Sequence, residues 1–203
     1  MFRVFRWFRN LLPRPAPPPH PLVVAARSTE PDVRREAAEQ FGGIPEVWAA
    51  EELLRLLTDL FTPVRDAARA SLRRQGAAAV PVLLQGLSHP RLEVSVASAD
   101  LLGEFPAQEA IEPLLVALKF SERPVQLAAG RALGRCGLLA VPALRAGLNE
   151  PQPWVRAQIA AALAEAEAVG RRAQEAVPGP SSEPAPSQNS TAPPALIPDR
   201  VDQ

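Results

Sequence analysis

Few side chains in this sequence could perform acid–base, nucleophilic or metal chemistry. The chain contains two histidines, His20 and His89, and one cysteine, Cys136. A nucleophilic site needs a histidine beside a serine or cysteine, and a metal site needs several convergent ligands. Neither histidine is followed by Glu, and His89 in "SHPR" is typical of a solvated loop. We therefore expect no catalytic residue, no metal site and no cofactor.

Cys136 and the paired acids Glu51 and Glu52 have structural interpretations as well. Cys136 lies in "GRCGLL" beside Arg135, which would lower the pKa of the thiol, but most unpaired cysteines are buried and inert, and we favour that interpretation. Adjacent glutamates on a helix point to different faces, which is typical of solvated charge. "FGG" and "LGRCG" lack the strand and the lysine that a nucleotide-binding loop requires.

The 203-residue chain has 22 basic and 22 acidic residues, but they are unevenly placed. Residues 1–27 carry five arginines and no acid, whereas residues 28–170 carry 14 basic and 18 acidic residues, a net charge of −4. Binding to a phosphate backbone depends on clustered Lys and Arg, so the sequence disfavours a nucleic-acid partner. The single cysteine, the absence of an apolar run of roughly 18–20 residues and the lack of a secretory signal predict a cytoplasmic protein.

A phrase recurs about every thirty residues, as in "TPVRDAARASL" at residues 62–72. Small or apolar residues follow each valine of the repeat at offsets of four and eight, which lie on one helical face. The valines are Val33, Val64, Val94, Val125 and Val155. Pro63 and Pro124 directly precede two of them, as expected at the first turn of a helix. Each unit is thus predicted to begin with one helix.

A second helix is predicted before each following valine. Leucines lie seven and eleven residues upstream and form one apolar stripe. They are Leu57, Leu87, Leu118 and Leu148, and Leu53, Leu83, Leu114 and Leu144. Gly42, Gly103 and Gly134 are expected to end the first helices in a left-handed conformation.

Two short helices in a period of about thirty residues predict an all-α fold, an α-solenoid of about four and a half helix pairs in which stacked units share a core. The fifth unit, "PWVRAQIAAALAEAEA", has no second helix and is expected to cap the C-terminal end. The predicted organisation is an amphipathic helix over 1–12, a Pro-rich linker over 13–27, the repeat domain over 28–168 and a disordered tail over 169–203, which is rich in Pro, Ser and Ala.

The segments "VRDAARASLRRQG", "VQLAAGRALGRCG" and "VRREAAEQFGG" resemble HEAT-like repeats of the phycobilisome-lyase type. The resemblance covers residues 28–168. It implies a helical-repeat scaffold, and related repeats occur in bilin lyase subunits, phycobilisome-degradation factors and the iron enzyme deoxyhypusine hydroxylase. The His-Glu pairs of that iron enzyme do not occur here. The arginine after the valine is kept at Arg34, Arg65 and Arg156 but is replaced by Ser95 and Gln126, which puts any pairing by that arginine in doubt in the middle units.

The resemblance also implies that the second helices line the concave side of the solenoid, where a partner would bind. Residues off their core stripes are therefore the expected partner-binding residues. They are Trp48, Glu52, Arg55, Val82, Gln85, Val116 and Lys119. Trp and Arg often anchor interfaces. An alternative for Trp48 is that it covers the exposed N-terminal end of the solenoid.

The N-terminal sequence "MFRVFRWFRNLL" separates arginines from apolar residues when it is placed on a helix. One face carries Arg3, Arg6 and Arg9. The other is largely apolar and includes Phe5, Trp7 and Phe8, with Phe2 as the exception to the separation. Such a helix fits an anionic membrane surface. Docking onto the solenoid or a partner protein, and a disordered start, remain alternatives.

Two functional hypotheses follow. The first is a non-enzymatic scaffold or adaptor that binds a protein partner along the solenoid and is attached peripherally to a membrane by residues 1–12. The second, supported by the family resemblance alone, is a bilin lyase subunit or phycobilisome maintenance factor that handles a phycobiliprotein or a bilin.

Overall fold

The computed structural model describes residues 20–175. The helix expected over residues 1–12, the first part of the linker and the tail from residue 176 lie outside the described residues. Between residues 20 and 175 every regular element is helical. The elements are α1 (Pro21–Ala25), α2 (Pro31–Phe41), α3 (Val47–Leu56), α4 (Thr62–Gln75), η3 (Gly76–Ala79), α5 (Val80–Gly86), α6 (Leu92–Leu102), α7 (Gln108–Phe120), α8 (Arg123–Arg135), η4 (Gly137–Leu139), α9 (Val141–Gly147) and α10 (Pro153–Glu175).

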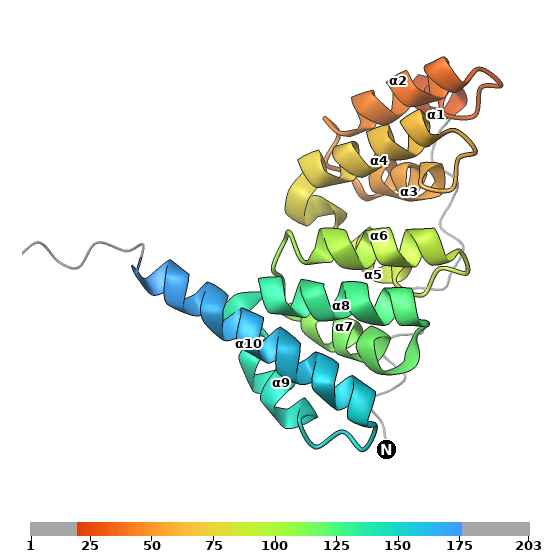
Figure 1. The fold of residues 1–203 in the computed structure, drawn as a ribbon. Coiled ribbons are helices and arrows are strands. Elements are labelled where there is room, and N and C mark those ends of the chain that lie inside the picture. The colour runs from red at the N-terminus through yellow and green to blue at the C-terminus, as the bar shows by residue number, and fades with distance from the viewer. Residues whose placement is uncertain (1–19, 176–203) are drawn as a thin grey trace, which may run out of the picture.

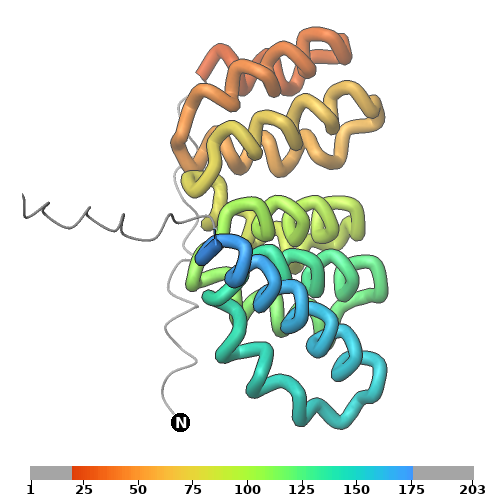
Figure 2. The backbone as a smooth tube through the Cα atoms, turned by 60° about the vertical axis from the view of Figure 1, so that its left-hand side comes forward, coloured from red at the N-terminus to blue at the C-terminus, as the bar shows by residue number. Residues whose placement is uncertain are grey.

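The helices stack in two layers along one direction (Figure 1). Helices α2, α4, α6, α8 and α10 follow one another in the first layer, and α3, α5, α7 and α9 in the second. We call the surface of these four helices the second-helix face. Each pair packs on the next, and Figure 2 shows the same succession from another side. The predicted α-solenoid is confirmed.

The core lies between the two layers and is made by the apolar residues that recur at the same positions of each repeat. The leucines eleven residues before each valine are fully buried, with 0% exposure: Leu53, Leu83, Leu114 and Leu144. On the first helices Ala68, Ser98 and Ala129 are also at 0%. Their small side chains let the neighbouring helices approach closely while the leucines fill the space between the layers.

Helix α1 corrects the predicted linker, which was expected to extend to residue 27. Val23 and Ala26 are buried at 7% and 0% exposure and pack into the solenoid core. Leu22 and Ala26 lie eleven and seven residues before Val33, which are the core positions of a second helix. Helix α1 therefore occupies the position of a second helix in a preceding unit. Among residues 20–175 no helix of the first layer precedes α2, and Val33 is 39% exposed.

Helix α10 corrects the other boundary, because the repeat domain does not end at residue 168. The helix continues to Glu175, and Ala162, Ala166 and Gly170 are buried along one face. This face packs on α8, α9 and η4. Small residues at a spacing of four allow that close approach, so the helix keeps a packing surface beyond the last repeat position.

The glycines predicted to adopt left-handed caps do not adopt them. Gly42 and Gly103 have φ of −63° and −70°, and Gly134 lies inside α8. The positive φ values belong to Gly76 and Gly137, at 61° and 60°, where the chain turns between the helices of a unit. A side chain at Gly103 would meet the backbone of Ala132, so this glycine permits close helix packing instead.

Candidate protein-binding surface

The turns between successive units are fixed by a polar residue at the same repeat position. Ser28 Oγ, Asp59 Oδ1 and His89 Nδ1 each accept the backbone N–H two residues later, at 3.2, 3.0 and 3.0 Å. This local hydrogen bond closes the turn before the next first helix. In the following unit the same position is Phe120, which has no atom that can accept such a bond.

The residue after each repeat valine holds the same turns from the helix side. Arg34, Arg65 and Arg156 donate to the carbonyl oxygen six residues earlier, at 2.9, 2.7 and 2.7 Å. Ser95 keeps this bond at 3.0 Å with its hydroxyl. Gln126 does not, and instead accepts from Trp154 Nε1 at 3.2 Å. The doubt raised by the sequence therefore applies to Gln126, while Ser95 performs the same task as arginine.

Only the first of these arginines also joins two units through an acid. Arg34 Nε and Nη2 lie 2.7 and 3.0 Å from the two carboxylate oxygens of Asp59. The side chains are 13% and 8% exposed. The pKa of Asp59 is lowered, chiefly by this hydrogen-bonded pairing with Arg34. The pair fixes the α2 unit against the turn of the next unit.

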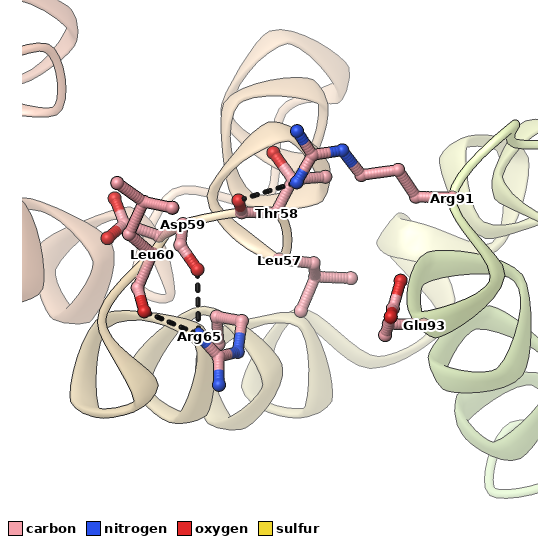
Figure 3. Close-up of a pocket in the computed structure, with 7 residues that line it drawn as sticks. All are labelled: Leu57, Thr58, Asp59, Leu60, Arg65, Arg91 and Glu93. Carbon is pink, nitrogen blue, oxygen red and sulfur yellow. Dashed lines mark hydrogen bonds between the residues drawn. The ribbon is translucent and has the colours of Figure 1, made fainter.

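One hollow between units lies at this row of turns (Figure 3). Leu57 lines it, with Arg65 on one side and Arg91 and Glu93 on the other. Arg65 donates to the carbonyls of Asp59 and Leu60, and Arg91 to that of Thr58 at 3.2 Å. Both guanidinium groups therefore donate hydrogen bonds to backbone carbonyls and stabilise the turn.

The hollows do not suit a small-molecule site. Four of them, between neighbouring units, measure about 240 to 270 Å³. Pockets for small ligands usually exceed about 300 Å³. Within residues 20–175 no group of three or more His, Cys, Asp and Glu side chains is placed to hold a metal ion. Over the same residues, no helix has the length and apolar character to span a bilayer.

Glu52 and Val82, which were predicted to bind a partner, are buried and cannot contact one. Glu52 is 8% exposed and accepts from Arg27 and Arg55, each at 2.8 Å. Arg55 also donates to the carbonyl of Ala26 at 2.9 Å, so these charges attach α1 to α3. Val82 is fully buried, because α5 is flanked by α3, α6 and α7. Gln85 remains exposed on α5.

Trp48 lies at the N-terminal end of the second-helix face and is half-buried. Its ring contacts Phe41 edge-on at 5.8 Å and His20 at 5.1 Å, and its Nε1 donates to Glu46. These contacts favour the alternative in which Trp48 covers the end of the solenoid.

Val116 and Lys119 lie where the sequence placed them, on the second-helix face, and Phe120 joins them. Val116 is 48% exposed and Phe120, one turn further along α7, is 77% exposed. Both line a groove between α7 and α9 that also includes Lys119, Ala143 and Ala146. We call it the α7–α9 groove. Sequence reasoning missed Phe120, although its signal was present: the corresponding residues are Ser28, Asp59, His89 and Glu150.

Cys136 is buried at 4% exposure, and burial raises the pKa of its thiol to about 11. The thiolate is the reactive form, so we expect Cys136 to react with a disulfide reagent at pH 8 at least a hundred times more slowly than in the urea-unfolded chain. A cysteine introduced by Leu139→Cys in a Cys136→Ser background is the control, since Leu139 is 44% exposed. Rapid labelling of the folded native protein at Cys136 would contradict the burial.

Together, the paired helices, the repeat period and the turns define an α-solenoid. Residues 80–164 match the family model described as HEAT repeats, so this part of the solenoid is similar to HEAT repeats, as the repeated sequence positions predicted. No curated protein matches the chain in sequence.

Several solved structures of helical-repeat proteins are similar in part. Phycocyanin lyase, as the CpcE and CpcF complex from Nostoc sp. PCC7120, shares 24% identity over 78% of this chain and 69% of that chain, with a TM-score of 0.45. Human deoxyhypusine hydroxylase shares 22% identity over 72% and 73%, with a TM-score of 0.46. Computationally designed armadillo repeat proteins for modular peptide recognition share 19% identity over 71% and 80%, with a TM-score of 0.41.

Proposed function

We propose that this protein is a non-enzymatic scaffold that binds a protein partner on its second-helix face, centred on the α7–α9 groove. Phe120 carries the proposal. A phenylalanine that is 77% exposed replaces the polar residue that closes three other turns. It contributes neither to the core nor to the turn. A residue that breaks a local rule without a structural gain marks a functional position, and large aromatic side chains are common interface anchors.

The surroundings of Phe120 support this use. The groove and a second hollow, lined by His89, Pro90 and Glu122 among others, border Phe120 on two sides. An aromatic side chain between two depressions can contact a partner across neighbouring units. The described residues supply no catalytic constellation near it, which favours binding over chemistry.

The test is photo-cross-linking with p-benzoylphenylalanine in place of Phe120, in a lysate of the source organism. We expect a discrete cross-linked protein from this position and none from the matched control at Arg69, which is exposed on the first layer. Adding Val116→Asp should reduce the product roughly ten-fold, the loss typical of a central interface residue. Identical products from both positions would contradict the proposal, and capture of a phycobiliprotein would favour the bilin-related alternative.

Residues 1–12 supply the second part of the proposal, a reversible attachment to anionic membrane surfaces. Three arginines lie among aromatic residues in this segment. Aromatic rings favour the headgroup region, and each arginine near an anionic surface adds about 1 kcal/mol.

We therefore expect the full chain to co-sediment with vesicles that contain phosphatidylserine, but not with neutral phosphatidylcholine vesicles. The charge-reversed variant Arg3→Glu/Arg6→Glu/Arg9→Glu should lose at least ten-fold in the bound fraction. Equal sedimentation of the native chain and the variant would show that this segment is not the membrane contact.

A further inference from the structure

The two walls of the α7–α9 groove differ in shape. Glu112, Val116 and Phe120 lie four residues apart on α7 and form one exposed ridge. The facing wall, on α9, is made of Ala143, Ala146 and Gly147, and Leu115 also lines the groove. Small residues opposite a ridge leave room for bulky side chains. The groove is thus shaped for a segment that brings large apolar groups of its own.

The α7–α9 groove carries a negative charge that no described cation neutralises. Lys119, which lines the groove, is 3.0 Å from Glu150, and Arg145 of α9 is 2.8 Å from Glu167 of α10, so both cations already have an acidic partner. Glu112 lines the groove, is exposed and has no ion pair with any described residue. The uncompensated charge is therefore negative and lies one turn from Val116. An occupant should bring a cation about one helical turn, roughly 6 Å, from an apolar anchor.

Residues 2–9 of the chain itself, "FRVFRWFR", have this chemistry. The segment alternates three arginines with four aromatic residues and contains no acid. We infer that residues 2–9 dock in the α7–α9 groove of the same molecule, with an arginine at Glu112 and aromatic side chains beside Val116 and Phe120. The inference rests on the proposed role of the groove as a docking site, and adds that residues 2–9 occupy it when no partner is bound.

The connecting chain is long enough for this contact. The described chain begins at His20, whose ring lies beside Trp48 near the start of α3. From α3 the second layer passes through α5 to α7. At about 8–10 Å between packed helices, these two steps amount to roughly 20 Å. Residues 13–19 read "PRPAPPP", and seven residues of a Pro-rich spacer extend about 22 Å at 3.1 Å per residue.

The docking gives one segment two competing positions. A partner protein must displace residues 2–9 from the groove, and an anionic surface that binds the same arginines would free the groove. Membrane attachment would then promote partner binding, because both events require the segment to leave the solenoid.

The test places p-benzoylphenylalanine at Phe5 of the dilute, purified full chain and maps the cross-links by mass spectrometry. We expect intramolecular cross-links to residues 112–120 or 143–147. Glu112→Lys should reduce their yield roughly five-fold through like-charge repulsion. Combining Glu112→Lys with Arg3→Glu/Arg6→Glu/Arg9→Glu should restore the yield. Asp66→Lys, an equal charge change at an exposed position of α4, should leave it unchanged.

The possible results separate this inference from the proposed function. Cross-links to other parts of the solenoid, to no part of it, or between two copies at doubled mass would overturn the intramolecular docking. If they occur while a probe at position 120 still captures a partner from the lysate, the proposed scaffold function stands alone. Cross-links to the groove that respond to Glu112 support the inference even where no partner protein is captured.

Discussion

Gly103→Val is expected to lower the free energy of unfolding by about 4 kcal/mol, and Gly103→Ala by about 2–3 kcal/mol. A Cβ atom added at Gly103 would lie 2.7 Å from Cα and 3.1 Å from Cβ of Ala132. The backbone of α8 fixes the positions of both atoms, so no side-chain rotation can relieve the contact. The α6 and α8 helices would have to separate, and the core between the units would loosen. Urea unfolding followed by circular dichroism at 222 nm measures the effect.

Gly43→Ala is the matched control for this prediction. Gly43 is exposed, its φ is not positive, and the nearest atom to an added Cβ is the carbonyl oxygen of Gln40 at an ordinary 3.6 Å. We expect a change within about 0.5 kcal/mol. Similar unfolding curves for Gly103→Val and the native chain would show that α6 and α8 do not pack as closely as the structure has them.

Asp59→Ala is expected to cost about 3 kcal/mol at pH 7. The substitution removes both carboxylate acceptors of the Arg34 guanidinium, which keeps only backbone carbonyl acceptors such as that of Ser28 and is only 13% exposed. A cation left without a compensating negative charge in a largely buried site is costly. The pair joins neighbouring units, so the damage should reach the N-terminal end of the solenoid. Glu104→Gln, which removes the charge of a more exposed pair with Arg73, should cost less than about 1 kcal/mol.

The Asp59 effect should depend on pH. Because pairing with Arg34 lowers the pKa of Asp59 in the folded protein, the pair stabilises the fold above the unfolded carboxyl pKa of about 3.9. The contribution is lost as the pH falls through the lower folded pKa. The difference in unfolding free energy between the native chain and Asp59→Asn should therefore be constant from pH 7 to pH 5 and shrink below pH 4. An unchanged difference at pH 3 would exclude titration of Asp59 as its source.

The apolar columns predicted the core well, because a repeat presents the same helix face many times. Val64, Val94, Val125 and Val155 are all buried, as their common position requires. Helix α1 could also have been predicted, since Leu22 and Ala26 occupy core positions of the same repeat. The prolines before it concealed that register. The extension of α10 had a weaker signal, because alanine and glycine at a spacing of four form a packing face without any large apolar residue.

The candidate site was only partly predictable. Val116 and Lys119, predicted from their position off the core stripe, line the α7–α9 groove, and Gln85 is exposed; a role of these residues in partner binding stays a prediction. The prediction that Glu52 and Val82 face a partner was wrong, because both are buried. Helical periodicity locates the face of a helix that packs on the core, but not how wide that face is. The width depends on the neighbours that pack against a helix, and α1 and its arginine partners bring Glu52 out of solvent.

The two-helix unit, its register and the fold class follow from the order of the amino acids alone, since they depend on local spacing and on one repeated pattern of burial. Which charged side chains form ion pairs, and which do not, depends on the tertiary structure. Glu150 pairs with Lys119, Glu167 with Arg145 and Asp59 with Arg34 across 22 to 31 residues, whereas Glu112 pairs with no described residue. Such pairs depend on how successive units are placed in space. The α7–α9 groove, with its unpaired Glu112 and its exposed Phe120, could therefore be recognised only from the arrangement of the units in space.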